Sequence, residues 1–227
     1  MIEFAKKLWP LNRSLTGTGV GSTLLLIKNK LPIKILNFKS GKKVFDWKIP
    51  KVWHLKEAWI KNKNDKKIVD FNTNNLHIVG YSQNINKILN FNDLKKKIHS
   101  LKSQPNAIPY VTSYYKKDWG FCLSKNEFQK LPKGKYKVYI DSSHKEGKLN
   151  IAHSVLKGKS KKEIFFSSYV CHPSMANNEL SGPVLLNEIL TYVSKIKNRN
   201  FTYRFVLVPE TIGSICYIHK YRKELKN

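Results

Sequence analysis

The pattern that most constrains the fold lies in the last third of the chain, where two strand-like runs flank a helix. Residues 163–170 read EIFFSSYV and residues 201–208 read FTYRFVLV, which are continuous runs of strand-forming residues. Between them, residues 180–196 carry apolar side chains at helical spacing: Val184, Leu185, Ile189, Val193 and Ile196. A strand, a helix and a strand within about 45 residues predict a βαβ unit with parallel strands. Bulky residues on both faces of 163–170 predict a strand buried on both sides.

The rest of the chain changes character twice. Before residue 40, the pattern predicts a short helix over residues 2–8, a second helix that runs from about Leu24 to Leu31, and a strand over residues 33–38. The middle is aromatic and β-branched, which predicts strands over residues 44–49, 56–61, 67–71, 76–81, 135–140 and 149–156, with a helix over 92–101. A last helix is expected over residues 213–225. The sequence therefore predicts an α/β fold that is interrupted by a smaller β-rich domain.

The charge of the chain needs an explanation, since 42 Lys and Arg residues against 15 Asp and Glu give a net charge of +27. Such a charge favours binding to nucleic acid or to anionic membranes. However, the lysines are spread over the whole chain and occur together with many asparagines, as in Lys61 to Asn64. This pattern is typical of a codon bias and of solvated surfaces. We therefore expect no specific nucleic-acid partner, and nucleic-acid binding stays the least favoured of three hypotheses.

Several protein classes are disfavoured by what the chain lacks. It has no run of about 18 apolar residues, so no membrane partner is expected. The N-terminal residues do not resemble a signal peptide, which predicts a cytoplasmic location. The three cysteines, Cys122, Cys171 and Cys216, are widely spaced and predict reduced, partly buried thiols. A homo-oligomer is left open.

Two polar residues follow the strands of the βαβ unit, at the edge where ligands bind in such sheets. His172 follows the first strand and Glu210 follows the second, so both can reach one metal ion. An imidazole with carboxylates is a common zinc-ligand set, and a nearby carboxylate can act as a general base. Glu179 lies at the start of the intervening helix and is a further carboxylate for this site. The alternative is that His172 is a hydrogen-bonded structural residue and that residues 178–182 only begin a helix.

Two other sets of residues suggest hydrolytic sites less strongly. Cys171 beside His172 suggests a thiol–imidazole pair, but neighbours along a strand point to opposite faces, which disfavours a cysteine protease. Asp141, Ser142 and His144 have the residue types of a hydrolytic triad, but they are expected to be solvated residues of a turn.

Sequence motifs over nearly the whole chain resemble those of bacterial aminopeptidase-like proteins, which have the co-catalytic zinc exopeptidase fold. The motifs, in chain order, are RSLTG at 13–17, KVFDW at 43–47, TSYY at 112–115, WGFC at 119–122, CHPSMANNELSGP at 171–183 and PETIGS at 209–214. The resemblance implies a mixed sheet flanked by helices and interrupted by a β-rich insert. It implies a peptidase-like domain of residues 1–43 and 144–227, and an inserted domain of residues 44–143.

The resemblance also implies a metal site. Family enzymes hold two zinc ions with histidines and carboxylates, and by position His172 corresponds to the first ligand. Asn178 stands where a bridging Asp is usual, and Glu179 is next to it. Glu210 corresponds to the glutamates that supply the base and a ligand, so it is predicted to be catalytic as well as metal-binding. Ser181 and Gly182 are expected to shape the metal-site loop.

The chain also departs from the family pattern in ways that affect the site. Asn178 is neutral and bridges two cations poorly, and Ser174 stands where an acidic residue usually orients the histidine. Later Asp and His ligands have no counterpart before Asn227, which predicts a C-terminally truncated or split product.

The resemblance gives the leading hypothesis, a zinc-dependent aminopeptidase-like hydrolase of peptide or amide bonds linked to surface-polysaccharide synthesis. The alternative is a catalytically inactive peptidase-fold binding protein or fragment.

Overall fold

The chain forms two compact units in a computed structural model that describes residues 1–114 and 116–226. Tyr115, the last residue of the TSYY motif, and Asn227 lie outside the described residues. The first unit comprises Met1–Val52 and Lys145–Asn227, and the second comprises Trp53–His144. The predicted insert began at residue 44, whereas the contacts place residues 44–52 in the first unit. These residues include most of the β2–β3 ribbon, Lys43–Val44 and Trp47–Lys48, and β2 contacts helix α6 of the first unit.

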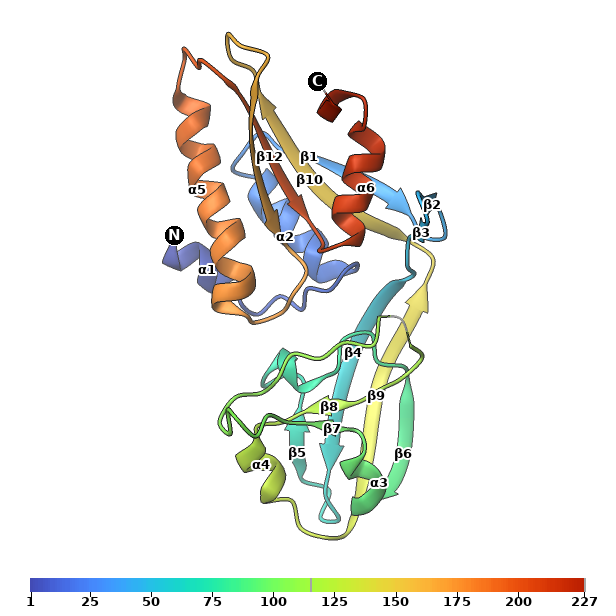
Figure 1. Cartoon of the computed structure of the whole chain (residues 1–227). Coiled ribbons are helices and arrows are strands. Elements are labelled where there is room, and N and C mark those ends of the chain that lie inside the picture. Colours follow the sequence, from blue (N-terminus) through green and yellow to red (C-terminus); the bar gives the residue numbers. More distant parts are fainter. Residues whose placement is uncertain (115, 227) are drawn as a thin grey trace. The chain divides into compact units, whose positions relative to one another are not determined.

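The first unit is built on a four-stranded mixed sheet with the order β1-β10-β12-β11 (Figure 1). Its strands are β1 (Lys34–Lys39), β10 (Lys148–Leu156), β11 (Glu163–Tyr169) and β12 (Thr202–Val208). Strands β1, β10 and β12 pair antiparallel, and β11 pairs with β12 in parallel. The predicted βαβ unit is therefore present, because α5 (Ser181–Lys195) connects β11 to β12.

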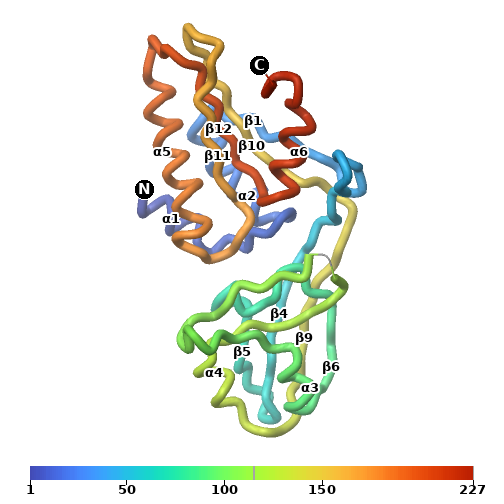
Figure 2. Tube along the Cα trace, in the orientation of Figure 1, coloured from blue at the N-terminus to red at the C-terminus, as the bar shows by residue number. Residues whose placement is uncertain are grey.

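Helices cover both faces of this sheet, as the backbone traces show (Figures 1 and 2). One face packs against α1 (Ile2–Leu8), α2 (Thr18–Lys28) and α5, with Leu8, Leu24 and Leu190 fully buried in a shared core. The other face packs against α6 (Ile212–Tyr221), which is followed by the short turn η3 (Glu224–Lys226). Neighbouring residues of β12 face the two layers in turn: Phe205 belongs to the core under α1, α2 and α5, whereas Arg204 contacts Tyr217 of α6.

The second unit is β-rich. Its main sheet has the order β5-β4-β9-β6, formed by β4 (Val52–Lys61), β5 (Lys67–Asp70), β6 (Ile85–Asn90) and β9 (Lys135–Lys145). A two-stranded ribbon of β7 (Ile98–His99) and β8 (Phe121–Cys122) accompanies it. The short helices are η1 (Asn75–His77), α3 (Phe91–Lys95) and α4 (Lys125–Gln129). Ser124 begins α4 with a capping box to Glu127, which satisfies backbone donors at the helix start.

Three expectations from the sequence need correction. The helix predicted over 92–101 ends at Lys95, and Ile98–His99 pairs as β7 instead. Residues 76–81 form a 3-10 turn with isolated bridges rather than a strand. Neither β6 nor α4 was anticipated. Finally, β11 is not buried on both sides: it lies at the edge of its sheet, and Phe165 and Tyr169 are each 47% exposed.

No helix in the described part of the chain is both long enough and apolar enough to cross a membrane.

Candidate metal centre

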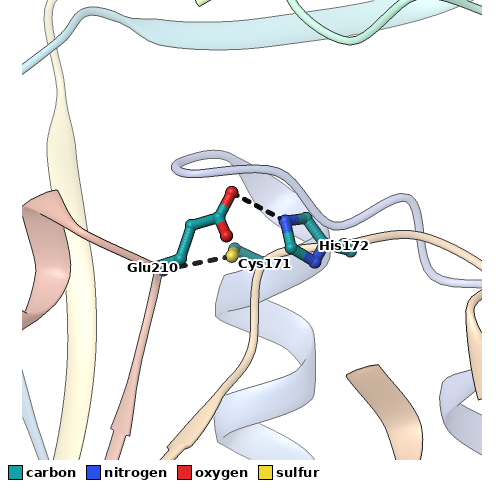
Figure 3. A group of neighbouring side chains, drawn as sticks. All are labelled: Cys171, His172 and Glu210. Carbon is teal, nitrogen blue, oxygen red and sulfur yellow. Dashed lines mark hydrogen bonds and ion pairs between the residues drawn. The ribbon is translucent and has the colours of Figure 1, made fainter. Parts of the chain in front are cut away.

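His172 and Glu210 meet at the carboxyl ends of two parallel strands. Tyr169 and Val208 are register partners at the ends of β11 and β12, so the residues that follow them leave the sheet side by side. Nε2 of His172 lies 2.9 Å from Oε1 of Glu210 (Figure 3). His172 is 5% exposed, whereas the Glu210 side chain is 34% exposed and reaches solvent. The structure thus brings together the two residues that the sequence placed at this edge.

Glu179 lies on the opposite side of the imidazole ring and is completely buried. Its Oε1 accepts hydrogen bonds from the backbone N–H groups of Cys171 and His172, the latter at 2.8 Å. Its Oε2 lies 3.0 Å from Nδ1 of His172. Asn178 also approaches this nitrogen, with Oδ1 at 3.0 Å. The carboxylate therefore fixes the backbone of the His172 loop and one side of the ring at the same time.

These contacts determine how the imidazole is presented. Oxygen acceptors face both ring nitrogens, Asn178 and Glu179 at Nδ1 and Glu210 at Nε2, so protons on both nitrogens are stabilised. A zinc ion would replace the proton on Nε2, while the proton on Nδ1 would remain. Metal-binding histidines usually have their second nitrogen fixed in this way by a carboxylate or carbonyl. Burial lowers the pKa of His172, but its hydrogen bonds and Coulomb interactions with Cys171 and Glu179 outweigh burial and raise the pKa.

Cys171 belongs to the same cluster, contrary to the expectation that its side chain points away from His172. Atoms of Cys171, His172 and Glu210 that can bind a metal all lie within 4.8 Å of one another (Figure 3). The alternation argument fails because β11 ends at Tyr169, so Cys171 and His172 are not strand residues. The Cys171 thiol is fully buried, accepts a hydrogen bond from the backbone N–H of Glu210 at 3.2 Å, and has its pKa raised by burial. Such a thiol is a poor nucleophile.

Arg13 is a site residue whose role the sequence analysis missed, although its motif was noted. Its side chain is 2% exposed, and its Nε donates to the backbone carbonyl of His172 at 2.9 Å. Nη1 donates to the carbonyl of Leu8 at 2.6 Å, which links the loop after β11 to helix α1. The pKa of Arg13 is lowered by burial, an effect that the charge of Glu179 opposes. Arg13, the first residue of the RSLTG motif, therefore positions the candidate ligand, an effect that only the fold reveals.

The backbone near the site is unusual. Thr211, which follows Glu210, has a φ of 54°, and Ser174, two residues after His172, has a φ of 41°. Both conformations are rare for residues other than glycine, and strain of this kind concentrates at functional sites. Residues Ala176–Leu180 form a π-helical turn, η2, that carries Asn178 and Glu179. Gly182 follows it, and a Cβ there would lie 2.2 Å from Oγ of Ser168.

Asp141, Ser142 and His144 do not lie in a turn, because all three are part of β9. Ser142 is buried, and its hydroxyl donates to the carbonyl of Ser82 at 2.7 Å. All three are therefore strand residues rather than the solvated turn residues that the sequence predicted.

The donor set at the strand ends fits a zinc ion. An imidazole nitrogen and a carboxylate oxygen are ordinary zinc ligands, and their positions leave the Glu210 side accessible to solvent. The buried thiol is the weaker donor because zinc binds the thiolate, which burial disfavours.

Comparison with known proteins assigns the chain to a family. A family model described as "Domain of unknown function (DUF4910)" matches residues 2–227. The chain belongs to this family.

The sequence is also 42% identical over 222 residues to a Clostridium acetobutylicum protein named "Putative polysaccharide biosynthesis protein with aminopeptidase-like domain". The match covers 98% of this chain and 51% of that protein. The chain thus spans about half the length of this relative.

Solved structures place the fold among peptidases. The crystal structure of a "putative peptidase" from Clostridium acetobutylicum matches with a TM-score of 0.96 and 41% identity, over 99% of this chain and 53% of that one. A zinc aminopeptidase from Bacillus subtilis matches with a TM-score of 0.57 at 14% identity, over 98% of this chain and 66% of that one. A peptidase M28 precursor from Shewanella amazonensis matches with a TM-score of 0.62 at 9% identity, over 99% and 67%. The last two likenesses show the fold alone.

Proposed function

We propose that the chain contributes a zinc site to an aminopeptidase-like hydrolase of peptide or amide bonds. The observation that carries the proposal is the meeting of His172 Nε2 and Glu210 Oε1 at the ends of two parallel strands, 2.9 Å apart. The aminopeptidase-like domain in the name of the Clostridium relative supports it. We also propose, from the same name, that the reaction belongs to polysaccharide biosynthesis.

In this proposal His172 and Glu210 hold zinc, and Glu210 additionally moves protons. Zinc, when bound, supplies Lewis-acid polarisation of the scissile carbonyl. Glu210 is a suitable base because its side chain reaches solvent and its carboxylate has a second oxygen besides the one near His172. Arg13 and Glu179 hold the His172 loop in place, so the imidazole loses little freedom when a ligand binds.

The roles of Glu179 and Asn178 differ here from those of the sequence-based prediction, which made both of them metal ligands. Their oxygens face Nδ1 of His172, whereas Glu210 faces Nε2. We therefore propose that Glu179 and Asn178 orient the histidine and that the metal lies on the Nε2 side. The prediction that they bind metal directly is the alternative.

A second function, a peptidase-fold binding protein without metal, is favoured by one observation. Glu210 pairs directly with His172, which satisfies both side chains without an ion. In the hydrolase, zinc would break the contact between His172 and Glu210 and bind both residues, whereas in the binding protein this contact would remain.

Hydrolysis of a panel of aminoacyl p-nitroanilides tests the proposal, with the chain assayed in zinc and after dialysis against a chelator. We expect turnover that the chelator abolishes and zinc restores, and that is lost in His172→Ala and Glu210→Gln. Glu188→Gln, which alters a carboxylate on the exposed part of α5, is the matched control. Turnover that persists without zinc and in both variants would refute the proposal, and an inactive chain that binds no zinc would favour the binding protein.

A further inference from the structure

A pocket lies in the first unit, at the end of the sheet opposite to the candidate metal centre. Its cavity of about 580 Å³ is lined by residues at the start of β11 and β12, among them Glu163 and Thr202. His172 and Glu210 follow the other ends of the same strands. A seven-residue strand is about 20 Å long, so the pocket is separate from the metal centre.

The pocket is lined by basic side chains. They come from the connection between β10 and β11, whose sequence from residue 157 to 162 is KGKSKK, and from the buried Arg204 of β12. The cations in the lining are Lys157, Lys159, Lys161 and Arg204, and the carboxylates are Glu163 and Glu224. Counted from these six residues, the lining has a formal charge of +2.

The two kinds of cation have different surroundings. Arg204 is 3% exposed and is committed to protein partners: Nε and Nη2 donate to the Glu163 carboxylate at 2.6 and 2.8 Å, and Nη1 donates to the Tyr217 hydroxyl at 2.9 Å. By contrast, Lys157, Lys159 and Lys161 form no ion pair with a carboxylate within the described ranges 1–114 and 116–226. The Glu163 carboxylate is thus paired with Arg204, and the lysine ammonium groups remain available for a ligand.

The loop that carries these lysines is held in place. The N–H groups of Lys159 and Ser160 donate to the carbonyls of Arg199 and Asn200 at 2.9 and 2.8 Å. Arg199 Nε donates to the carbonyl of Lys157 at 3.0 Å. Gly158 permits this close packing, since a Cβ there would lie 2.1 Å from the carbonyl oxygen of Phe201. A fixed backbone keeps like charges together, and an anion among them would relieve their repulsion.

His153 also lines this pocket and lies against helix α6. Its two ring nitrogens lie 3.2 Å from the hydroxyls of Tyr217 and Tyr221. Burial and the charges of Arg204, Lys34 and Lys220 lower the pKa of His153 to about 4. The imidazole is therefore neutral at pH 7, and a bound anion would raise its pKa.

We propose that this pocket binds a phosphate-bearing small molecule through Lys157, Lys159 and Lys161. Ammonium groups are compact point charges that bind phosphate without the planar geometry of a guanidinium–carboxylate pair. The formal charge of the lining matches a phosphoryl dianion. A cavity of this volume is within the range of small-molecule sites.

The test uses inorganic pyrophosphate as the probe, with the whole chain, and follows the histidine ring signals by NMR. We expect saturable binding of one pyrophosphate per chain and an upward shift of the pKa of His153. Lys159→Gln/Lys161→Gln should weaken binding at least about tenfold, because each lost contact involves two charged groups. Lys133→Gln/Lys135→Gln is the matched control, because it removes the same charge at the same spacing from exposed residues of the other unit. It should change the affinity less than about twofold.

Other results would overturn the proposal. Equal weakening in both variants, with an unchanged His153 titration, would show that pyrophosphate responds only to the dispersed net charge. Malonate binding as tightly as pyrophosphate would replace phosphate with a carboxylate ligand. Binding of RNA alone, with a steep log-linear dependence on salt, would identify a nucleic-acid surface instead.

Discussion

The substitution Glu179→Gln separates an orienting carboxylate from a metal ligand. Glutamine keeps a carbonyl oxygen for the N–H groups of Cys171 and His172 but removes the charge. A hydrogen bond to a charged acceptor contributes about 1.5–3 kcal/mol and a neutral one about 0.5–1.5 kcal/mol, so converting two such bonds costs about 2–3 kcal/mol. Hydrogen exchange of the β12 amides measures this loss for the first unit by itself.

Zinc affinity gives the second readout of the same variant. Removing a residue that only orients a ligand lowers metal affinity about 10–100-fold, and we expect Glu179→Gln to fall in this range. His172→Ala, which removes the imidazole, should abolish specific binding, whereas the exposed Glu188→Gln should leave stability unchanged within about 0.5 kcal/mol. The reasoning is refuted if Glu179→Gln is as stable as the unsubstituted chain, or if it loses zinc as completely as His172→Ala.

Three further predictions concern the first unit. The pKa of His153 is about 4 in the folded chain against an ordinary value of 6.5, so the unfolded chain binds one more proton between these pH values. The free energy of unfolding should therefore decrease by about 2–3 kcal/mol as pH falls from 6.5 to 4. Urea unfolding at several pH values should show a weaker dependence of this free energy on pH in His153→Phe. Leu24→Ala should cost about 2–5 kcal/mol in the same assay, because Leu24 is fully buried and a cavity remains. Gly182→Ala should cost about 1–3 kcal/mol by crowding Ser168, and a double variant with Ser168→Ala should recover part of that loss; additive losses would contradict the crowding.

Much of the first unit could be predicted because its elements depend on local patterns. The runs at 163–170 and 201–208 and the helix between them are strongly periodic, and the structure has β11, α5 and β12 there. What failed depended on neighbours distant in the sequence. The exposure of Phe165 could not be predicted, because burial of a strand depends on its position in the sheet and not on its composition.

The candidate site was predicted in its residues better than in its geometry. His172 and Glu210 could be paired because both follow strands of one βαβ unit. The side of the ring that Glu179 occupies could not be read from the sequence, since it depends on the π-helical turn η2. The role of Arg13 depends on a contact across 159 residues of sequence, which has no local signal.

Zinc titration of the purified chain by calorimetry, beside His172→Ala and Glu210→Gln, tests the central claim most directly. The account predicts one zinc ion per chain, released by a chelator and bound by neither variant. Absence of specific zinc binding by the unsubstituted chain, or equal binding in His172→Ala, would contradict a metal centre at the ends of β11 and β12.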